Sequence, residues 1–167
     1  QINLLRPSAY IIFADMKETS ALIDKACRNL NIDSLNGMQK QMLETAMRPN
    51  DIILLSPTGS GKTLAFLLPV LSRISPKIAG VQALVIVPSR ELALQIDNVL
   101  RQIAAGIKIV CCYGGHSVRE ESKSLAVAPA LIVGTPGRIA DHIRRGRIVL
   151  ETLDTLVLDE FDKCLAL

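Results

Sequence analysis

The chain has 167 residues, the length of one ordinary domain and too short for two. Hydrophobic residues make up 49% of it and aromatic residues only 3%, which excludes a disordered chain and predicts a core of aliphatic side chains. The formal net charge of +3 permits an anionic partner but is too small to indicate one. We therefore expect a single domain over residues 1–167.

The cysteines and the apolar runs bear on the cellular compartment. The four cysteines show neither a disulfide framework nor metal-ligand spacing, which is typical of free thiols in a reducing compartment. No apolar run is long enough to span a bilayer and no signal peptide opens the chain, so we expect an intracellular, cytoplasmic protein without a membrane anchor. The chain begins at Gln1 and stops at Leu167 within an apolar stretch, so we also expect it to be a fragment of a longer protein.

Strand and helix patterns alternate along the chain. A largely helical segment over residues 16–47 comes first, and it could cap one edge of a sheet. Short apolar runs bounded by turn residues follow, and their length and composition favour strands. The predicted strands cover residues 52–55, 83–87, 107–112, 130–133 and 155–158. Helical periodicity fills the stretches between them, over residues 62–71, 89–103, 117–127 and 136–143.

This alternation predicts an α/β fold, a doubly wound and mostly parallel sheet with helices on both faces. In such sheets, ligands collect at the carboxyl ends of the strands. We therefore expect the loops that follow the strands to carry the function.

The first such loop has the chemistry of a phosphate site. Residues 56–63 read S-P-T-G-S-G-K-T and lead into a predicted helix, although Ser56 stands where the general P-loop pattern has glycine. The two glycines let the backbone curl around a phosphate, and the helix aims its positive end at the same anion. Lys62 can bridge the β- and γ-phosphates, and the Thr63 hydroxyl can ligate Mg²⁺. The predicted nucleotide-binding residues here are Thr58, Gly59, Ser60, Gly61, Lys62 and Thr63.

The last predicted strand ends in an acidic motif, D-E-F-D at residues 159–162. A carboxylate at the tip of an apolar strand beside a phosphate loop is where an NTPase holds Mg²⁺, which indicates Asp159. The adjacent Glu160 can orient or deprotonate an attacking water. Parallel packing of the intervening strands could bring both loops together. We therefore predict Lys62, Asp159 and Glu160 as catalytic residues, and Thr63 and Asp159 as metal ligands.

Five motifs, taken in chain order, resemble those of DEAD-box RNA helicases. They are S-P-T-G-S-G-K-T, P-S-R-E-L at residues 88–92, G-G at 114–115, T-P-G-R at 135–138 and D-E-F-D. The resemblance covers the chain from about Phe13 onward and implies the N-terminal RecA-like, ATP-binding domain of such a helicase. It further implies ATP and Mg²⁺ as cofactors, RNA-stimulated ATPase and helicase activity, a monomer, and a second RecA-like domain in the same protein.

The same resemblance assigns residues to the adenine base and exposes departures from the family pattern. Gln39 corresponds to the adenine-reading glutamine, and Phe13 to the aromatic residue that packs near the base. The usual Pro-Thr before that glutamine is absent, because residues 35–39 read L-N-G-M-Q. The alternative is that Gln39 is a surface residue on a helix over residues 36–47. Phe161 replaces the alanine of D-E-A-D.

Three further loops offer hydroxyls, backbone N–H groups and arginines, which suit phosphates and riboses better than base edges. The resemblance assigns them to the backbone of single-stranded or duplex RNA. From the residues alone, Arg90 could instead pair with an acid, and Thr135 could simply cap a helix. The residues predicted to contact RNA are Ser89, Arg90, Gly115, Thr135 and Arg138. His116 and His142 are assigned no site.

The sequence leaves three functions open. The leading one is an ATP-dependent RNA helicase or RNA-remodelling ATPase. The second is an ATP-gated RNA clamp or assembly module that unwinds little, and the third is a P-loop NTPase unrelated to nucleic acid, such as a small-molecule kinase. For the first, we expect the isolated chain to bind nucleotide and turn it over slowly, because the second domain would supply arginines against the γ-phosphate.

Overall fold

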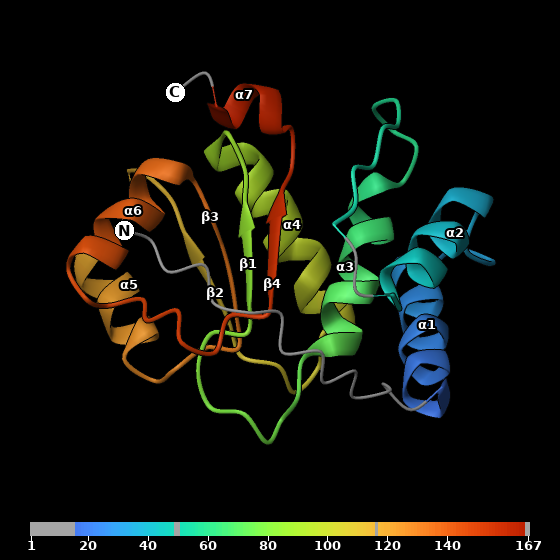
Figure 1. Cartoon of the computed structure of the whole chain (residues 1–167), viewed down its shortest axis with the longest axis horizontal. Helices are drawn as coiled ribbons and strands as arrows, with labels where there is room; N and C mark the ends of the chain where they lie inside the picture. Colours follow the sequence, from blue (N-terminus) through green and yellow to red (C-terminus); the bar gives the residue numbers. More distant parts are fainter. Residues whose placement is uncertain (1–15, 49–50, 116, 166–167) are drawn as a thin grey trace.

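The computed structural model describes residues 16–48, 51–115 and 117–165. Within them, four strands form one parallel sheet in the order β2-β3-β1-β4, with helices on both faces (Figure 1). The predicted α/β fold is therefore confirmed. The elements are α1 (Met16–Leu30), α2 (Gly37–Ala46), α3 (Lys62–Arg73), β1 (Ala83–Ile86), α4 (Arg90–Ile103), β2 (Ile109–Cys112), α5 (Val118–Leu125), β3 (Leu131–Gly134), α6 (Pro136–Arg144), β4 (Thr155–Leu158) and α7 (Phe161–Leu165).

The strands are aligned so that they end together. Ile86, the last residue of β1, is paired in register with Gly134 of β3 and Leu158 of β4. Cys112, the last residue of β2, also lies opposite Gly134. The loops after all four strands therefore leave from one edge of the sheet, where we expected ligands to collect.

Alternate residues along the strands build two separate cores. Val85 and Val133 face a large core shared with α3 and α4, whereas Leu84 and Ile132 face a smaller core on the other side. Helices α5 and α6 cover the smaller core, and α1 and α2 pack outside α3 and α4 (Figure 1). The central strands β1 and β3 are buried on both faces, which explains why they read as continuous apolar runs.

The segment before the sheet is helical, as predicted. Its main contacts are with other helices and not with an edge strand of the sheet. Helix α1 contacts α3 and α4, and α2 contacts α3, so both helices thicken the layer on one face. Helix α2 also reaches a cavity beside β4 through Met42 and Ala46.

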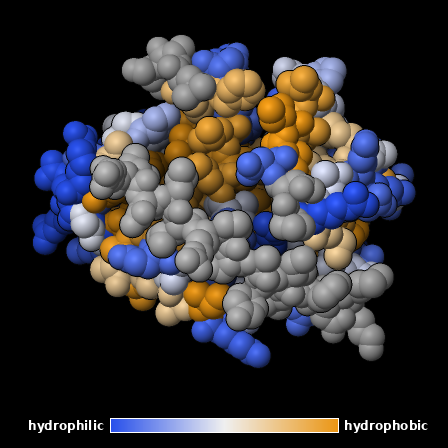
Figure 2. Space-filling model, in the orientation of Figure 1, coloured by the Kyte–Doolittle hydropathy of each residue, from blue (hydrophilic) through white to orange (hydrophobic). Residues whose placement is uncertain are grey.

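The predicted strand over residues 52–55 is wrong. No strand is formed there, and Ile53 and Leu55 are 81% and 83% exposed. Residues 51–54 and β4 line a cavity of about 470 Å³, and no backbone hydrogen bond joins them in the described chain. A strand needs a partner about 5 Å away, so this apolar run stays irregular. Figure 2 shows apolar side chains gathered on this face of the molecule.

Four free cysteines are present, as predicted. Burial raises the pKa of the Cys111 and Cys112 thiols to about 12, so both are protonated at neutral pH. None of the helices in the described ranges is both long and apolar enough to cross a membrane.

The close fit at the end of β3 generates a stability prediction. A Cβ added to Gly134 would meet the carbonyl oxygen of Cys112 and the side chain of Ile139, so neither strand could keep its place. We expect Gly134→Ala to cost about 2 kcal/mol and lower the Tm by about 4–8 °C in a thermal melt followed by circular dichroism. In Gly37→Ala, the matched control, the new methyl meets nothing within 4 Å, and the Tm should not fall. Equal effects of the two substitutions would contradict the close fit.

Candidate functional site

The loop before α3 is curled as a phosphate loop requires. It turns at Thr58 and Gly59, and α3 begins at Lys62. Gly59 and Gly61 have φ values of 80° and 85°, the left-handed region that favours glycine. A Cβ at Gly61 would also lie 2.5 Å from the side-chain nitrogen of Gln39. The two glycines are therefore required by the backbone path itself.

Helix α2 holds this loop through two side chains. Asn36 and Gln39 form a capping box, in which each backbone N–H donates to the other side chain at 2.9 Å. Their remaining amide nitrogens reach the loop. Asn36 Nδ2 donates to the Ser60 carbonyl at 3.0 Å, and Gln39 Nε2 donates to the Gly61 carbonyl at 3.1 Å. Helix α2 and the loop therefore form one unit.

The position of Gln39 excludes one of the two sequence interpretations of this residue. Gln39 is only 5% exposed, so its interpretation as a surface residue is wrong. Its role in reading adenine stays a prediction, and Phe13 lies outside the described residues. The signal for the structural role was the N-x-x-Q spacing, which is typical of a capping box.

The acidic motif meets the phosphate loop at the end of β4. Asp159 is 7% exposed, and it lines the same cavity as Lys62. Burial raises the pKa of Asp159, and this effect is opposed by Lys62 and by the hydrogen bond from the Glu160 N–H at 3.0 Å. The structure thus brings together two side chains that are 97 positions apart in the sequence (159 − 62). A buried carboxylate beside a lysine offers hard oxygen ligands to a divalent cation.

The other three residues of the acidic motif are less buried than Asp159. Glu160 has a φ of 48°, which is unfavourable for a residue with a side chain and marks local strain. Its carboxylate accepts a hydrogen bond from Lys163 Nζ at 2.8 Å, and this contact raises the pKa of Lys163. Phe161 is 47% exposed and lines the cavity, and Asp162 is exposed in the first turn of α7.

Two predicted site residues follow β1. Ser89 forms a hydrogen bond within the protein, and Arg90 is exposed. The Ser89 hydroxyl caps α4 by accepting a hydrogen bond from the Leu92 N–H at 3.2 Å. Arg90 is exposed, and its guanidinium lies 5.0 Å from the centroid of the Tyr113 ring. Within the described ranges Arg90 forms no ion pair, so the alternative that it pairs with an acid is not realised there. Gly115, with a φ of 82°, lies beside this guanidinium.

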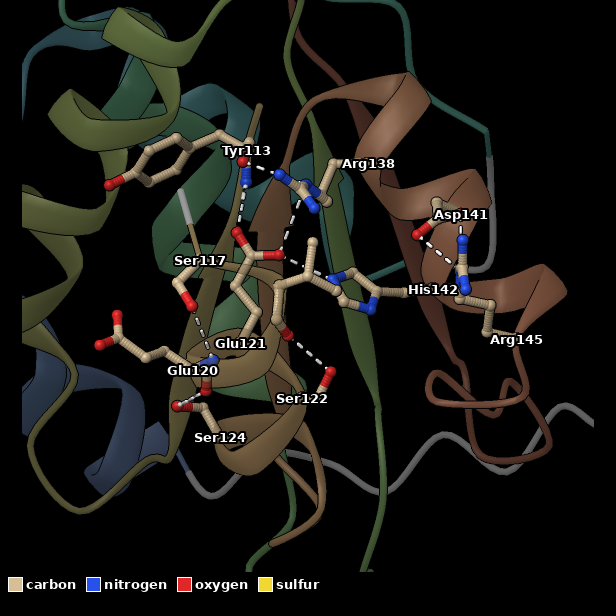
Figure 3. Close-up of polar contacts among 11 residues, drawn as sticks. Tyr113, Ser117, Glu120, Glu121, Ser122, Ser124, Arg138, Asp141, His142 and Arg145 are labelled. Carbon is tan, nitrogen blue, oxygen red and sulfur yellow. Dashed lines mark hydrogen bonds and ion pairs between the residues drawn. The ribbon is translucent and has the colours of Figure 1, made fainter. Parts of the chain in front are cut away.

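The loop after β3 divides in the same way. Thr135 occupies the N-cap position of α6, but its hydroxyl makes no capping hydrogen bond. The side chain of Arg138 is only 13% exposed. Its Nε donates to the Tyr113 carbonyl at 3.1 Å and lies 3.5 Å from Glu121 Oε2 (Figure 3). The Arg138 guanidinium is thus held by the protein, whereas the Thr135 hydroxyl forms no hydrogen bond within the described residues.

Two residues in this network were missed by the sequence analysis. Glu121 of α5 is 2% exposed and His142 of α6 is fully buried, and their side chains meet at 2.7 Å (Figure 3). Each lies on the buried face of its helix, with Leu125 four residues after Glu121 and Ile139 three residues before His142. That spacing was the available signal. Helical spacing predicts that a residue lies on the buried face of its helix, but it does not predict which residue of another helix it contacts.

Cys112 lies near this pair, and donor atoms of Cys112, Glu121 and His142 are all within 4.8 Å of one another. A thiol binds a metal as the thiolate. Burial, with the nearby Glu121 charge, raises the pKa of Cys112 to about 12, so the thiol stays protonated. Arg138 already lies beside the Glu121 carboxylate. We therefore interpret the cluster as a polar network and not as a metal centre.

Comparison with known proteins gives one consistent family. The family model described as DEAD/DEAH box helicase matches residues 36–167. The chain is 38% identical over 143 residues to the DEAD-box ATP-dependent RNA helicase CshA of Geobacillus kaustophilus, covering 84% of this chain and 31% of that protein. It is 35% identical over 156 residues to the ATP-dependent RNA helicase DeaD of Escherichia coli, covering 92% of this chain and 25% of that protein.

A solved structure agrees with these relatives. The crystal structure of the yeast DEAD-box splicing factor Prp28 matches with a TM-score of 0.75 and 31% sequence identity, over 84% of this chain and 35% of that chain. The predicted RecA-like fold is therefore confirmed. The chain spans about a third of the length of the curated relatives it matches.

The buried carboxylate at the site generates a prediction about stability and pH. Because the folded state raises the pKa of Asp159, it binds the proton more tightly than the unfolded state, and the metal-free chain loses stability as the pH rises through that raised pKa. We expect Asp159→Asn to raise the Tm at pH 7 by about 2–4 °C. The gain should disappear below about pH 3, because an unfolded aspartate has a pKa of about 3.9 and the carboxyl is mostly protonated in both states only below that value.

Asp162→Asn is the matched control, because Asp162 is exposed and three residues away. Its Tm should equal that of the parent chain at both pH values. A lower Tm for Asp159→Asn at pH 7 would show that the Asp159 charge stabilises the fold, contrary to this prediction.

Proposed function

The chain belongs to the DEAD/DEAH box helicase family, and from this premise we propose that it is the ATP-binding, RecA-like domain of an ATP-dependent RNA helicase or RNA-remodelling ATPase. The observation that carries the proposal is that Lys62 and Asp159 line one cavity beside a glycine-turned loop. We also propose that a second RecA-like domain of the same protein completes both the ATP site and the RNA site. The whole protein acts as a monomer in this proposal.

In this proposal the nucleotide lies on the loop over residues 58–63. Backbone N–H groups of the loop and the start of α3 bind the phosphates, and Lys62 neutralises the β- and γ-phosphates. The space next to Gly59 supports this, because a Cβ there would meet nothing within 4 Å. Thr63 and Asp159 hold Mg²⁺, whose charge offsets the negative charge on the phosphates. Glu160, the residue after Asp159, orients the attacking water.

RNA lies along the neighbouring edge of the sheet, against the loops after β1, β2 and β3. Arg90, Gly115 and Thr135 make the direct contacts with phosphate and ribose in this proposal. The exposure of Arg90, the left-handed turn at Gly115 and the uncommitted Thr135 hydroxyl support these assignments. Ser89 and Arg138 contribute mainly by shaping the loops, because their polar groups are bonded within the protein.

The decisive test is the ATPase rate of the full-length protein with and without single-stranded RNA at a fixed salt concentration. We expect RNA to raise the rate, and Lys62→Ala to lower the RNA-stimulated rate by about 100-fold because the γ-phosphate loses its positive partner. Lys77→Ala, an exposed lysine beyond α3, is the matched control and should behave as the parent. A rate indifferent to RNA would instead support a P-loop NTPase that does not act on nucleic acid.

One contact favours a second candidate function, an ATP-gated RNA clamp or assembly module. The Glu160 carboxylate is engaged by Lys163, which competes with its use in activating water. In Glu160→Gln, turnover should fall by about 100-fold while ATP and RNA still bind together. Replacement of the chromosomal gene by this variant separates the two functions. A clamp keeps its cellular role when hydrolysis is blocked, and a remodelling ATPase loses it.

A further inference from the structure

One buried carboxylate lies beneath the loops of the proposed RNA edge. Glu121 projects from α5 toward the ends of β2 and α6, and its two oxygens contact different neighbours (Figure 3). We propose that Glu121 is a positioning residue for RNA binding, which holds the loop over residues 113–115 and the start of α6 over residues 135–138 as one surface. This inference rests on the proposed RNA-binding function.

The backbone of Tyr113 is held on both sides. Its N–H donates to Glu121 Oε1 at 3.2 Å, and its carbonyl accepts from Arg138 Nε at 3.1 Å. The peptide groups on both sides of Tyr113 are therefore fixed by side chains from two other elements. Gly114 and Gly115 follow directly, so the position of the G-G loop depends on this double contact.

The contacts of Glu121 extend beyond Tyr113 to Arg138 and, through the Tyr113 ring, to Arg90. Glu121 Oε2 lies 3.5 Å from Arg138 Nε, so the carboxylate and the guanidinium hold each other as well as Tyr113. The Tyr113 ring in turn lies under the guanidinium of Arg90, which belongs to the loop after β1. A single carboxylate thus acts, directly or through one neighbour, on all three loops of the edge.

His142 contacts the same carboxylate from α6. Its Nε2 lies 2.7 Å from Glu121 Oε2, and its Nδ1 is buried with no hydrogen-bond partner in the described structure. Because a carboxylate only accepts, Nε2 carries the proton and donates it. The imidazole therefore serves the carboxylate alone, and it fixes the oxygen that also faces Arg138. Both side chains are buried, so breaking this contact would cost the free energy of separating two buried polar groups.

The test compares Glu121→Gln with Asp141→Asn in the full-length protein. Both changes neutralise a carboxylate that faces an arginine, but Asp141 pairs with Arg145 on the outer side of α6. RNA affinity is measured by fluorescence anisotropy with a labelled ten-nucleotide oligouridine, and nucleotide affinity with a fluorescent ATP analogue. We expect Glu121→Gln to weaken RNA binding about tenfold, the scale of one lost charge-assisted hydrogen bond, and to leave nucleotide affinity within about twofold. Asp141→Asn should change neither affinity.

A double-mutant cycle tests whether Glu121 acts through Arg138. In the Arg138→Ala background, Glu121→Gln should weaken RNA binding by less than about threefold, because its partner is already gone. Full additivity of the two losses would overturn the proposal. At His142, Gln retains a donor for Oε2 and should keep RNA affinity, whereas Leu removes the donor and should lower it. Equal RNA affinities of His142→Gln and His142→Leu would also overturn the proposal.

The outcomes separate this inference from the proposed function. If Arg90→Ala leaves RNA binding unchanged, the proposed RNA edge is wrong. If Arg90→Ala weakens RNA binding but Glu121→Gln does not, the edge stands and the positioning role is wrong. If Glu121→Gln lowers RNA and nucleotide affinity equally, together with the Tm, then the residue only supports the fold and the inference is overturned.

Discussion

The arrangement of this molecule depends on the in-register parallel pairing of β1 with β3 on one side and β4 on the other. Because Ile86, Gly134 and Leu158 end their strands side by side, the loops that follow them open at one edge. Asp159 is placed one residue beyond that line, where it meets Lys62 in the same cavity. No side chain of the site needs a long reach, because the backbone pairing has already brought the loops together.

Both proposed ligand-binding regions are held by polar side chains from neighbouring helices. On one side of the sheet, the amides of Asn36 and Gln39 bind carbonyls of the phosphate loop. On the other, Glu121 and Arg138 bind the backbone of Tyr113. Glycine-rich loops are intrinsically mobile, so these bonds reduce the conformational entropy that a ligand would otherwise have to remove. Side-chain amide, carboxylate and guanidinium groups thus hold the backbone conformation of both loops through hydrogen bonds.

The sequence predicted the features that are encoded locally. The phosphate loop and the helices after Lys62 and Ser89 were predictable because glycine placement, caps and periodicity act within a few residues. The strand over residues 52–55 was not, because a strand depends on a neighbour that local apolar content cannot guarantee. The contact between Glu121 and His142 was missed for the same reason. Helical spacing places each residue on a buried face, but the meeting of α5 with α6 is set by tertiary packing.

The open side of β4 has a practical consequence. Beyond this strand the described chain pairs no further backbone, and Leu156, Leu158 and Phe161 are 54%, 42% and 47% exposed next to the cavity (Figure 2). Unpaired amides flanked by apolar side chains form a template on which another extended chain can grow. We therefore expect the isolated chain to self-associate more readily as its concentration rises or when salting-out ions are added.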